Sequence, residues 1–198
     1  MQLILASVSP YRKILLDRLR LPFSCRTPDV DEAVLLDEAP AMRARRLAYS
    51  KAASATPEQS QRPTLVIGSD QVACLGDQIL RKPSTAQRAA AQLALCSGKS
   101  IIFWTGVSVI SSTGQHWHQM VRSDVTLRHL SSEEIKRYIE LDKPLSCAGS
   151  FKWESLGISL FQRLETPDPT ALEGLPLIAL CELLREAGLS VPIASQPR

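Results

Sequence analysis

The sequence lacks the features that mark several large classes of protein. Its 23 basic and 20 acidic residues give a net charge of only +3, too balanced for a dedicated nucleic-acid binder. Five scattered cysteines contain no CxxC pair, which argues against a zinc site or a disulfide framework. No apolar run approaches the ~20 residues of a membrane span, and the short apolar segment 3–6 has no basic segment before it. We therefore expect a cytoplasmic protein without nucleic-acid or membrane partners.

What is present fits an ordinary globular enzyme. The hydrophobic share of 44% and the charged share of 22% are sufficient for a proper core, and 198 residues suit one large domain or two small lobes. Apolar runs and helical periodicity are mixed along the chain, which predicts an α/β or α+β fold. Strands are expected at residues 3–6, 65–68, 101–110 and 121–127, and helices at residues 10–20, 40–53, 84–96, 131–141 and 175–187.

The beginning of the chain predicts an anion-binding turn. Ser9 can cap a helix whose first position is Pro10, where the missing N–H costs nothing. Ile14, Leu15 and Leu19 then fall on one helix face. A strand that ends in small polar residues at a helix N-terminus leaves unpaired N–H groups pointing outward, as a phosphate requires.

Three clusters are candidates for chemistry: the turn at 7–12, the carboxylates at 29–32, and Ser69-Asp70-Gln71 with Lys82 shortly after. The last group is expected at the C-terminal end of a strand, where α/β proteins often place functional groups. Each cluster alone is a weak signal. An Asp at a strand end is more often a cap or turn residue, and a Lys before a proline is more often plain surface.

Together, the strings resemble the Maf family of nucleotide pyrophosphatases. The resemblance covers nearly the whole chain, and the opening Leu-Ile-Leu-Ala-Ser-x-Ser-Pro-x-Arg is an uncommon string. The matching positions are residues 7–12, Asp31-Glu32, Leu47-Ala48, Lys51-Ala52, residues 68–71, Lys82-Pro83, Thr105-Gly106, Ala148-Gly149 and residues 174–177.

The resemblance implies an elongated mixed sheet with flanking helices and two lobes around a central cleft. It suggests one Maf-like domain over residues 1–198, with a flexible tail from about residue 190, and it leaves a homodimer open. It also implies hydrolysis of a nucleoside triphosphate to a monophosphate and diphosphate, with Asp70 as the catalytic acidic residue. Ser7, Arg12, Lys51 and Lys82 match positions around the phosphates, and Glu32 with Asp70 matches the position of a divalent metal, Mg²⁺, Mn²⁺ or Co²⁺.

These residue types suit that reaction. Cationic side chains stabilise the negative charge that develops on the leaving diphosphate. One or two carboxylates plus substrate phosphates are the usual ligands of Mg²⁺ or Mn²⁺. A free Asp, with a pKa of about 3.9, is a weak base near neutrality, so a metal-activated water that Asp70 also orients is the preferred interpretation.

Three positions point to the nucleobase. Tyr11, Gln71 and Glu154 resemble the branch of the family that acts on 7-methyl-GTP, rather than the branch that acts on dTTP and UTP. Methylation at N7 gives guanine a positive charge, which Tyr11 could stack on and Glu154 could balance, while Gln71 could bond a base edge. In the alternative interpretation, Tyr11 and Gln71 only pack or cap the helix.

Other interpretations stay open. His116 and His118 have the i, i+2 spacing of two ligands on one strand face, but no third ligand is near in sequence, so we expect a solvent-facing hairpin. Arg43, Arg45 and Arg46 suggest a solvated helix face. The polar stretch 56–63 predicts a mobile surface loop. The substrate could be another modified or canonical triphosphate, and the protein could be a non-catalytic regulator linked to septum formation.

Overall fold

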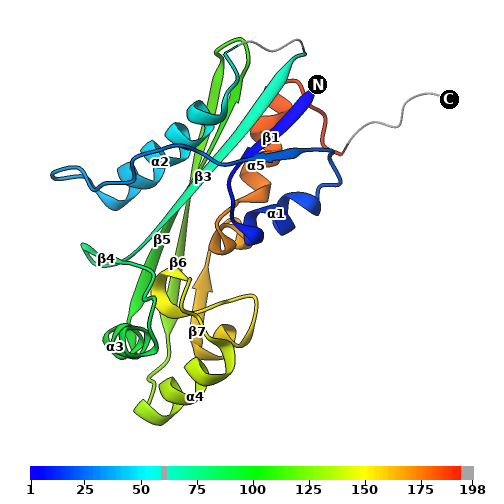
Figure 1. The fold of residues 1–198 in the computed structure, drawn as a ribbon. Coiled ribbons are helices and arrows are strands. Elements are labelled where there is room, and N and C mark those ends of the chain that lie inside the picture. Colours follow the sequence, from blue (N-terminus) through cyan, green and yellow to red (C-terminus); the bar gives the residue numbers. More distant parts are fainter. Residues whose placement is uncertain (59–61, 193–198) are drawn as a thin grey trace. The chain divides into compact units, whose positions relative to one another are not determined.

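The computed structural model describes residues 1–58 and 62–192, which form a seven-stranded mixed sheet with helices (Figure 1). The strand order is β2-β1-β3-β5-β6-β7, and β4 pairs with β3. β1 runs parallel to β2 and β3, whereas β3–β4 and β6–β7 are antiparallel. The strands are β1 (Gln2–Ala6), β2 (Ser24–Arg26), β3 (Thr64–Leu75), β4 (Gln78–Leu80), β5 (Ser100–Ser111), β6 (His116–Leu127) and β7 (Phe161–Glu165). The helices are α1 (Pro10–Asp17), α2 (Pro40–Ala55), α3 (Ala86–Cys96), α4 (Ser132–Asp142) and α5 (Leu177–Glu186), with short 3-10 turns η1 (Ala148–Ser150), η2 (Leu156–Leu160) and η3 (Pro169–Glu173).

The chain divides into two compact units. Unit 1 comprises Met1–Gln71, Thr105–Val121 and Asp168–Arg198, and unit 2 comprises Val72–Trp104 and Arg122–Pro167. Unit 1 therefore contains the helices α1, α2 and α5, and unit 2 contains α3 and α4. None of the helices in the described residues is both long enough and apolar enough to cross a membrane.

In unit 1, the strands bury both of their faces. Leu3, Leu5, Leu65 and Ile67 pack with leucines of α1 and α5, while Ile4, Ala6 and Val66 pack with alanines of α2. Successive side chains of a strand point to opposite faces, so an unbroken apolar run fills both cores. The position of each residue along β3 therefore decides whether it faces α2 or faces α1 and α5.

Glycines in neighbouring strands let α2 lie close against the sheet. A Cβ added at Gly68 would meet the backbone O of Ala48 at 2.2 Å and the backbone N of Ala52 at 2.5 Å. A Cβ at Gly106 would meet the O of Ala44 at 2.8 Å. Because a methyl group at Gly68 would overlap helix backbone, a glycine is required there, and the close approach brings Lys51 of α2 over β3.

Unit 2 has its own aromatic core and a polar hub. Phe151 packs edge-on against Phe103 and Phe161, with ring centroids 5.5 and 5.0 Å apart. The Asp142 side chain at the end of α4 accepts hydrogen bonds from the Tyr138 hydroxyl at 2.8 Å and the Ser155 hydroxyl at 2.7 Å. Burial raises the pKa of the Tyr138 phenol, so it stays a hydrogen-bond donor to Asp142.

An aspartate distant in sequence caps α5. The buried Asp168 carboxylate accepts the N–H of Ile178 at 2.7 Å and the Thr170 hydroxyl at 2.6 Å. The residue before the helix, Pro176, offers no side-chain hydrogen bond, so Asp168 satisfies an otherwise unpaired N–H group of the first turn.

Local signals predicted the helices well. Ser9 caps α1 and Pro10 opens it as expected, and α4 begins with a capping box formed by Ser131 and Glu134. Two details were wrong. The helix expected from residue 84 is capped by Thr85, because Ser84 adopts a left-handed φ of 62° while Thr85 has the extended backbone that a cap needs. On α1, Ile14 is exposed and the buried pair is Leu15 and Leu16.

Strand ends were predicted less well. β3 continues to Leu75, so Ser69, Asp70 and Gln71 lie inside the strand and not at its C-terminal end. β6 begins at His116, because the alternating segment 116–120 pairs as strand. β2, β4 and β7 were not predicted, since each is only three to five residues long. The expected mobile loop at 56–63 and flexible tail from about residue 190 fall in part on residues 59–61 and 193–198, outside the described residues.

Candidate functional site

A buried lysine joins two carboxylates in unit 1. Lys51 Nζ lies 2.6 Å from Asp70 Oδ1 and 2.7 Å from Glu32 Oε1. Lys51 comes from α2, Asp70 from β3, and Glu32 from the segment between β2 and α2. Two carboxylates that are 38 positions apart in the sequence therefore meet at the Lys51 ammonium group. The resemblance had implied that Asp70, Glu32 and Lys51 lie in one site.

Asp70 is buried, with 8% of the residue exposed, and its carboxylate contacts the Lys51 ammonium. In β3 it lies two positions after Gly68, so both residues project toward α2. The Glu32 side chain, by contrast, is 56% exposed. The pair thus combines a fixed carboxylate with one that solvent and ligands reach.

Arg12 lies on the other face of the sheet, in α1. Its Nε donates to the backbone O of Gly174 at 2.8 Å, and the buried Ser69 hydroxyl donates to the same oxygen at 2.7 Å. Burial lowers the pKa of the Arg12 guanidinium, and the negative charges of Asp70 and Glu32 oppose that effect. An arginine stays protonated in proteins, so Arg12 adds a positive charge close to the two carboxylates.

Ser7 belongs to the turn that positions Arg12. It is buried at the end of β1, and its hydroxyl oxygen accepts the N–H of Ser9 at 3.1 Å. The Ser9 hydroxyl in turn accepts the N–H of Arg12 at 3.5 Å. This is the strand–turn–helix arrangement that the sequence predicted, and Arg12 lies in the first turn of α1.

Gln71 faces the same side as Ser69. Its amide nitrogen donates to the O of Ala171 at 2.7 Å, the O of Leu172 at 3.2 Å and the Thr105 hydroxyl at 3.2 Å. The amide N–H groups are therefore used within unit 1, and only the amide oxygen of Gln71 is left for a base edge. Tyr11 lies half-buried in the first turn of α1, and no contact in the described residues decides between stacking and packing.

Two of the candidate residues lie in unit 2. Lys82 is exposed between β4 and α3, and Glu154 is exposed between η1 and η2. The structure therefore joins Asp70, Glu32 and Lys51 in direct contact within unit 1, and it places Arg12, Ser7, Tyr11 and Gln71 in the same unit. The roles of Lys82 and Glu154 remain predictions.

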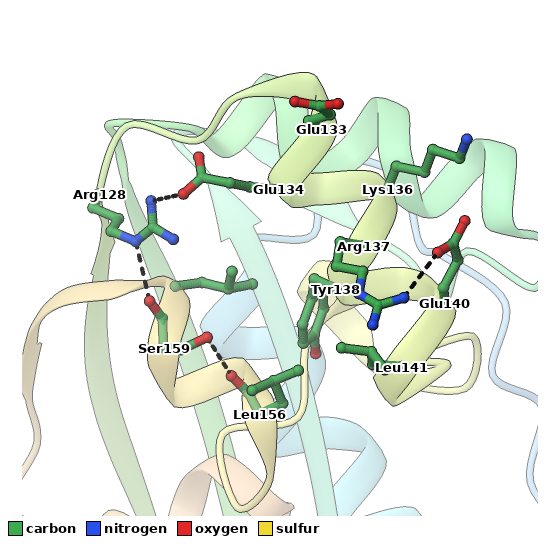
Figure 2. A pocket seen from close by; sticks show the side chains of 11 residues that line it. Arg128, Glu133, Glu134, Lys136, Arg137, Tyr138, Glu140, Leu141, Leu156 and Ser159 are labelled. Carbon is green, nitrogen blue, oxygen red and sulfur yellow. Dashed lines mark hydrogen bonds and ion pairs between the residues drawn. The ribbon is translucent and has the colours of Figure 1, made fainter.

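Unit 2 also has a surface pocket of about 570 Å³ between α4 and η2 (Figure 2). Two ion pairs lie along it, Arg128 with Glu134 at 2.7 Å and Arg137 with Glu140 at 3.7 Å, and Lys136 and Glu133 line it as well. None of the candidate residues lines this pocket. Its three cationic side chains are balanced in number by three carboxylates, so the pocket offers no surplus positive charge to a triphosphate.

Sequence reasoning missed the residues that hold the Glu32 segment. Arg43 and Arg46 of α2 donate to backbone carbonyls of residues 32 and 33, and Arg46 pairs with Glu38. The expected solvated face is therefore wrong for Arg43 and Arg46, whereas Arg45 is exposed. The signal was available: an acidic residue precedes two arginines spaced i, i+3, which share a helix face.

The two histidines lie in β6, directly after the turn that joins it to β5. The rings of His116 and His118 stack with centroids 6.2 Å apart, and Tyr49 of α2 meets His116 edge-on at 4.8 Å. Burial and the charge of Arg45 lower the pKa of both imidazoles. Within the described ranges, no three His, Cys, Asp or Glu side chains gather as a metal cluster. Asp70 and Glu32 are the metal ligands that the resemblance implies, and phosphate or water would have to complete the set.

Relatives of known name match nearly the whole chain. A protein of Pseudomonas savastanoi pv. phaseolicola named 7-methyl-GTP pyrophosphatase is 50% identical over 96% of this chain and 98% of its own length. Proteins of the same name from Pseudomonas aeruginosa and Chromohalobacter salexigens are each 49% identical, over 96% and 95% of this chain and 98% and 97% of their own lengths.

A solved structure of a nucleoside-triphosphatase (dITP/XTP pyrophosphatase) from Mycobacterium abscessus superposes with a TM-score of 0.42 at 12% identity. The superposition covers 66% of this chain and 76% of that chain. The sequence pattern of the family described as Maf-like protein, in contrast, matches residues 2–187. Together with relatives at half identity over nearly the full length, that match means that this chain belongs to the Maf family.

Proposed function

We propose that the protein is a metal-dependent pyrophosphatase that hydrolyses 7-methyl-GTP to 7-methyl-GMP and diphosphate. The observation that carries the proposal is the contact of Lys51 Nζ with both Asp70 and Glu32, at 2.6 and 2.7 Å. Relatives named for this activity, about half identical over 96% of the chain, support the choice of substrate.

The two carboxylates fit a divalent cation. Their oxygens already converge on one cationic group, the Lys51 ammonium, and oxygen donors are what Mg²⁺ and Mn²⁺ prefer. A Mg²⁺, Mn²⁺ or Co²⁺ ion held by Asp70 and Glu32 would supply charge neutralisation and a water of lowered pKa. Two protein carboxylates are sufficient, because such ions commonly keep several waters and bind the substrate phosphates directly.

The chain's own residues would divide the remaining work. Hydrolysis requires water to attack phosphorus while the bond to the leaving diphosphate breaks, so a proton must leave the water and negative charge grows on the diphosphate. Asp70 orients the water and accepts its proton, and Lys51 and Arg12 stabilise the growing charge. Ser7 adds a hydroxyl at the strand–helix turn, where backbone N–H groups suit a phosphate.

The remaining assignments rest on the resemblance. We propose that Lys82 contacts a phosphate, that Tyr11 and Glu154 recognise the methylated guanine through its positive charge, and that Gln71 reads a base edge. We further propose a cytoplasmic location without a nucleic-acid partner, and a homodimer as the form to test by light scattering.

A nucleotide panel tests the proposal. Purified protein is assayed with 7-methyl-GTP, GTP, dTTP and UTP, each with Mg²⁺, Mn²⁺ or Co²⁺, and both mononucleotide and diphosphate are measured. We expect 7-methyl-GTP to have the highest kcat/KM. A preference for dTTP and UTP would move the chain to the other branch, and binding without turnover would favour a regulatory protein.

A further inference from the structure

The segment that carries Glu32 has largely exposed apolar side chains. After Glu32 it continues through Val34, Leu35 and Leu36, which are 46, 51 and 93% exposed. None of these side chains belongs to either of the two cores described for unit 1. A loop without buried apolar side chains opens easily, unless polar contacts fix its backbone. The position of Glu32 beside Lys51 must therefore depend on polar contacts.

Two arginines of α2 supply those contacts. Arg43 donates to the carbonyl O of Glu32 at 2.5 Å and to the O of Ala33 at 3.2 Å. Arg46 donates to the same O of Ala33 at 3.1 Å. The two arginines are three residues apart, so they project from one face of the helix, and Figure 1 shows the segment leading directly into α2. One contact is made to the backbone of Glu32 itself.

Glu38 anchors the far end of the segment. Its side chain is only 7% exposed, and its carboxylate accepts hydrogen bonds from Nε and Nη2 of Arg46 at 2.5 and 2.8 Å. Arg43 approaches the same carboxylate at 3.7 Å. The hydrogen bond from Arg46 lowers the pKa of Glu38, so this group is ionised near neutrality. An arginine fork bound to two carboxylate oxygens fixes orientation as well as distance.

We propose that Arg43 and Arg46, with Glu38 as their anchor, are positioning residues for Glu32. The same helix carries Lys51, so α2 holds the Glu32 segment at its backbone and the Glu32 carboxylate at its side chain. This proposal rests on the proposed function in one respect, that Glu32 binds the divalent cation. Its mechanical part, a loop held by two guanidinium groups, stands independently of any reaction.

The helix provides a matched control. Arg45 lies between the two positioning residues, is exposed, and makes no hydrogen bond or ion pair with residues 1–58 or 62–192. Arg43→Gln/Arg46→Gln removes the hydrogen bonds that these two arginines make to the carbonyls of residues 32 and 33, which we call the clamp. Arg45→Gln removes one charge from the same helix and leaves the clamp intact. Arg46→Lys keeps the charge but cannot form the two-point contact with Glu38, so we expect an intermediate effect.

Hydrogen exchange tests the loop without any substrate. The hydrogen-bonded amides of this segment, those of Ala33 and Leu35, should exchange roughly 10–100-fold faster in Arg43→Gln/Arg46→Gln, while Arg45→Gln leaves them unchanged. Exchange on the buried face of α2 should remain slow in both variants. Unchanged exchange at Ala33 and Leu35 in the double variant overturns the proposal.

Binding of Mn²⁺ alone, followed by electron paramagnetic resonance, tests the link to Glu32. Loss of groups that orient a metal ligand costs roughly 10–100-fold in affinity, so we expect a loss of that size in the double variant. In a Glu32→Gln background, the arginine substitutions should cost nothing further. Losses that simply multiply would show that the arginines act elsewhere and would overturn the positioning role.

Failure of the proposed function would look different. If Glu32→Gln binds Mn²⁺ as the parent does, the metal role of Glu32 is wrong, and the exchange experiment then decides whether the clamp exists. If the parent hydrolyses no triphosphate, both experiments still run, because neither depends on turnover. Faster loop exchange with unchanged Mn²⁺ affinity, in a protein whose Glu32 does bind Mn²⁺, contradicts the proposal.

Discussion

The two faces of β3 carry different kinds of polar residue. Asp70 projects toward α2 and meets the Lys51 ammonium, which also contacts Glu32. Its neighbours Ser69 and Gln71 project to the other face and donate hydrogen bonds to backbone carbonyls of residues 106, 171, 172 and 174. One short stretch of strand thus supplies a charged carboxylate on one side and, on the other, neutral side chains that hydrogen-bond to the neighbouring backbone. The comparison predicts that substitutions on the two faces fail in different ways.

The largest effect should come from Asp70→Asn. The change keeps the size of the side chain but removes the negative charge that faces Lys51, so turnover should fall by about 10²–10⁴-fold while folding is retained. Steady-state kinetics with 7-methyl-GTP measures the loss, and thermal unfolding checks the fold. Near-parental activity would remove Asp70 from the mechanism and erase the proposed difference between the faces.

Lys51→Met should separate binding from turnover. Without the ammonium, the carboxylates of Asp70 and Glu32 face each other unbalanced, so Mn²⁺ in the absence of nucleotide should bind more tightly, by roughly tenfold. Turnover should nevertheless fall, because a cation that stabilises the leaving diphosphate is lost. Titration with Mn²⁺ and a parallel rate measurement test both parts. Weaker Mn²⁺ binding would contradict a shared cation site.

Tyr11→Arg and Glu154→Ala should alter selectivity more than rate. A cation–π contact contributes about 0.5–2 kcal/mol, which corresponds to roughly 2- to 30-fold in kcat/KM. The loss should appear with 7-methyl-GTP and be smaller with GTP, since only the methylated ring carries a positive charge. Equal losses on both nucleotides would argue against charge recognition.

The smallest effect on activity should come from Ser69→Ala. The Ser69 hydroxyl is fully buried and lies 2.7 Å from the carbonyl oxygens of both Gly106 and Gly174. Its loss removes a buried hydrogen bond, while the Gly174 oxygen keeps its bond from Arg12, and should lower the free energy of unfolding by about 0.5–1.5 kcal/mol with little change in kcat. Urea denaturation monitors the stability. A large fall in kcat with unchanged stability would place Ser69 in the chemistry.

Gly68→Ala would test how α2 reaches the strand. A methyl group there overlaps the backbone of Ala48 and Ala52, so the helix must shift, at a cost of about 1–3 kcal/mol. Because Lys51 moves with the helix, activity should fall as well. Gly76→Ala is the control: its Cβ would meet nothing within 4 Å, although its φ of +59° adds some local strain.

Local features of the sequence were sufficient to predict part of this structure. The caps at Ser9 and Ser131 act within three residues, so their pattern is legible without the fold. The convergence of Asp70, Glu32 and Lys51 came from a resemblance, since no spacing rule links them. The end of β3 was misjudged because polar Ser69, Asp70 and Gln71 read as a strand end, whereas they are paired inside a longer strand.

Contacts across the chain were beyond a single sequence. Asp168 caps a helix that starts nine positions later, at Leu177, and the arginines of α2 bind carbonyls rather than side chains. A carbonyl acceptor exists at every residue, so the amino-acid types alone do not identify the partner. The Arg46–Glu38 pair was more accessible to prediction, because both members are charged and eight positions apart.

The amide of Gln71 has a consequence for base selection. Three oxygen acceptors fix its nitrogen inward, so the orientation of the amide is set by the protein before any nucleotide arrives. What remains is a lone-pair oxygen, which attracts an N–H edge and repels another lone pair. Guanine and its N7-methylated form present N–H groups on the pairing edge where adenine presents a bare ring nitrogen. The amide oxygen of Gln71 should therefore favour a base with an N–H group on its pairing edge, whether or not the base carries a positive charge.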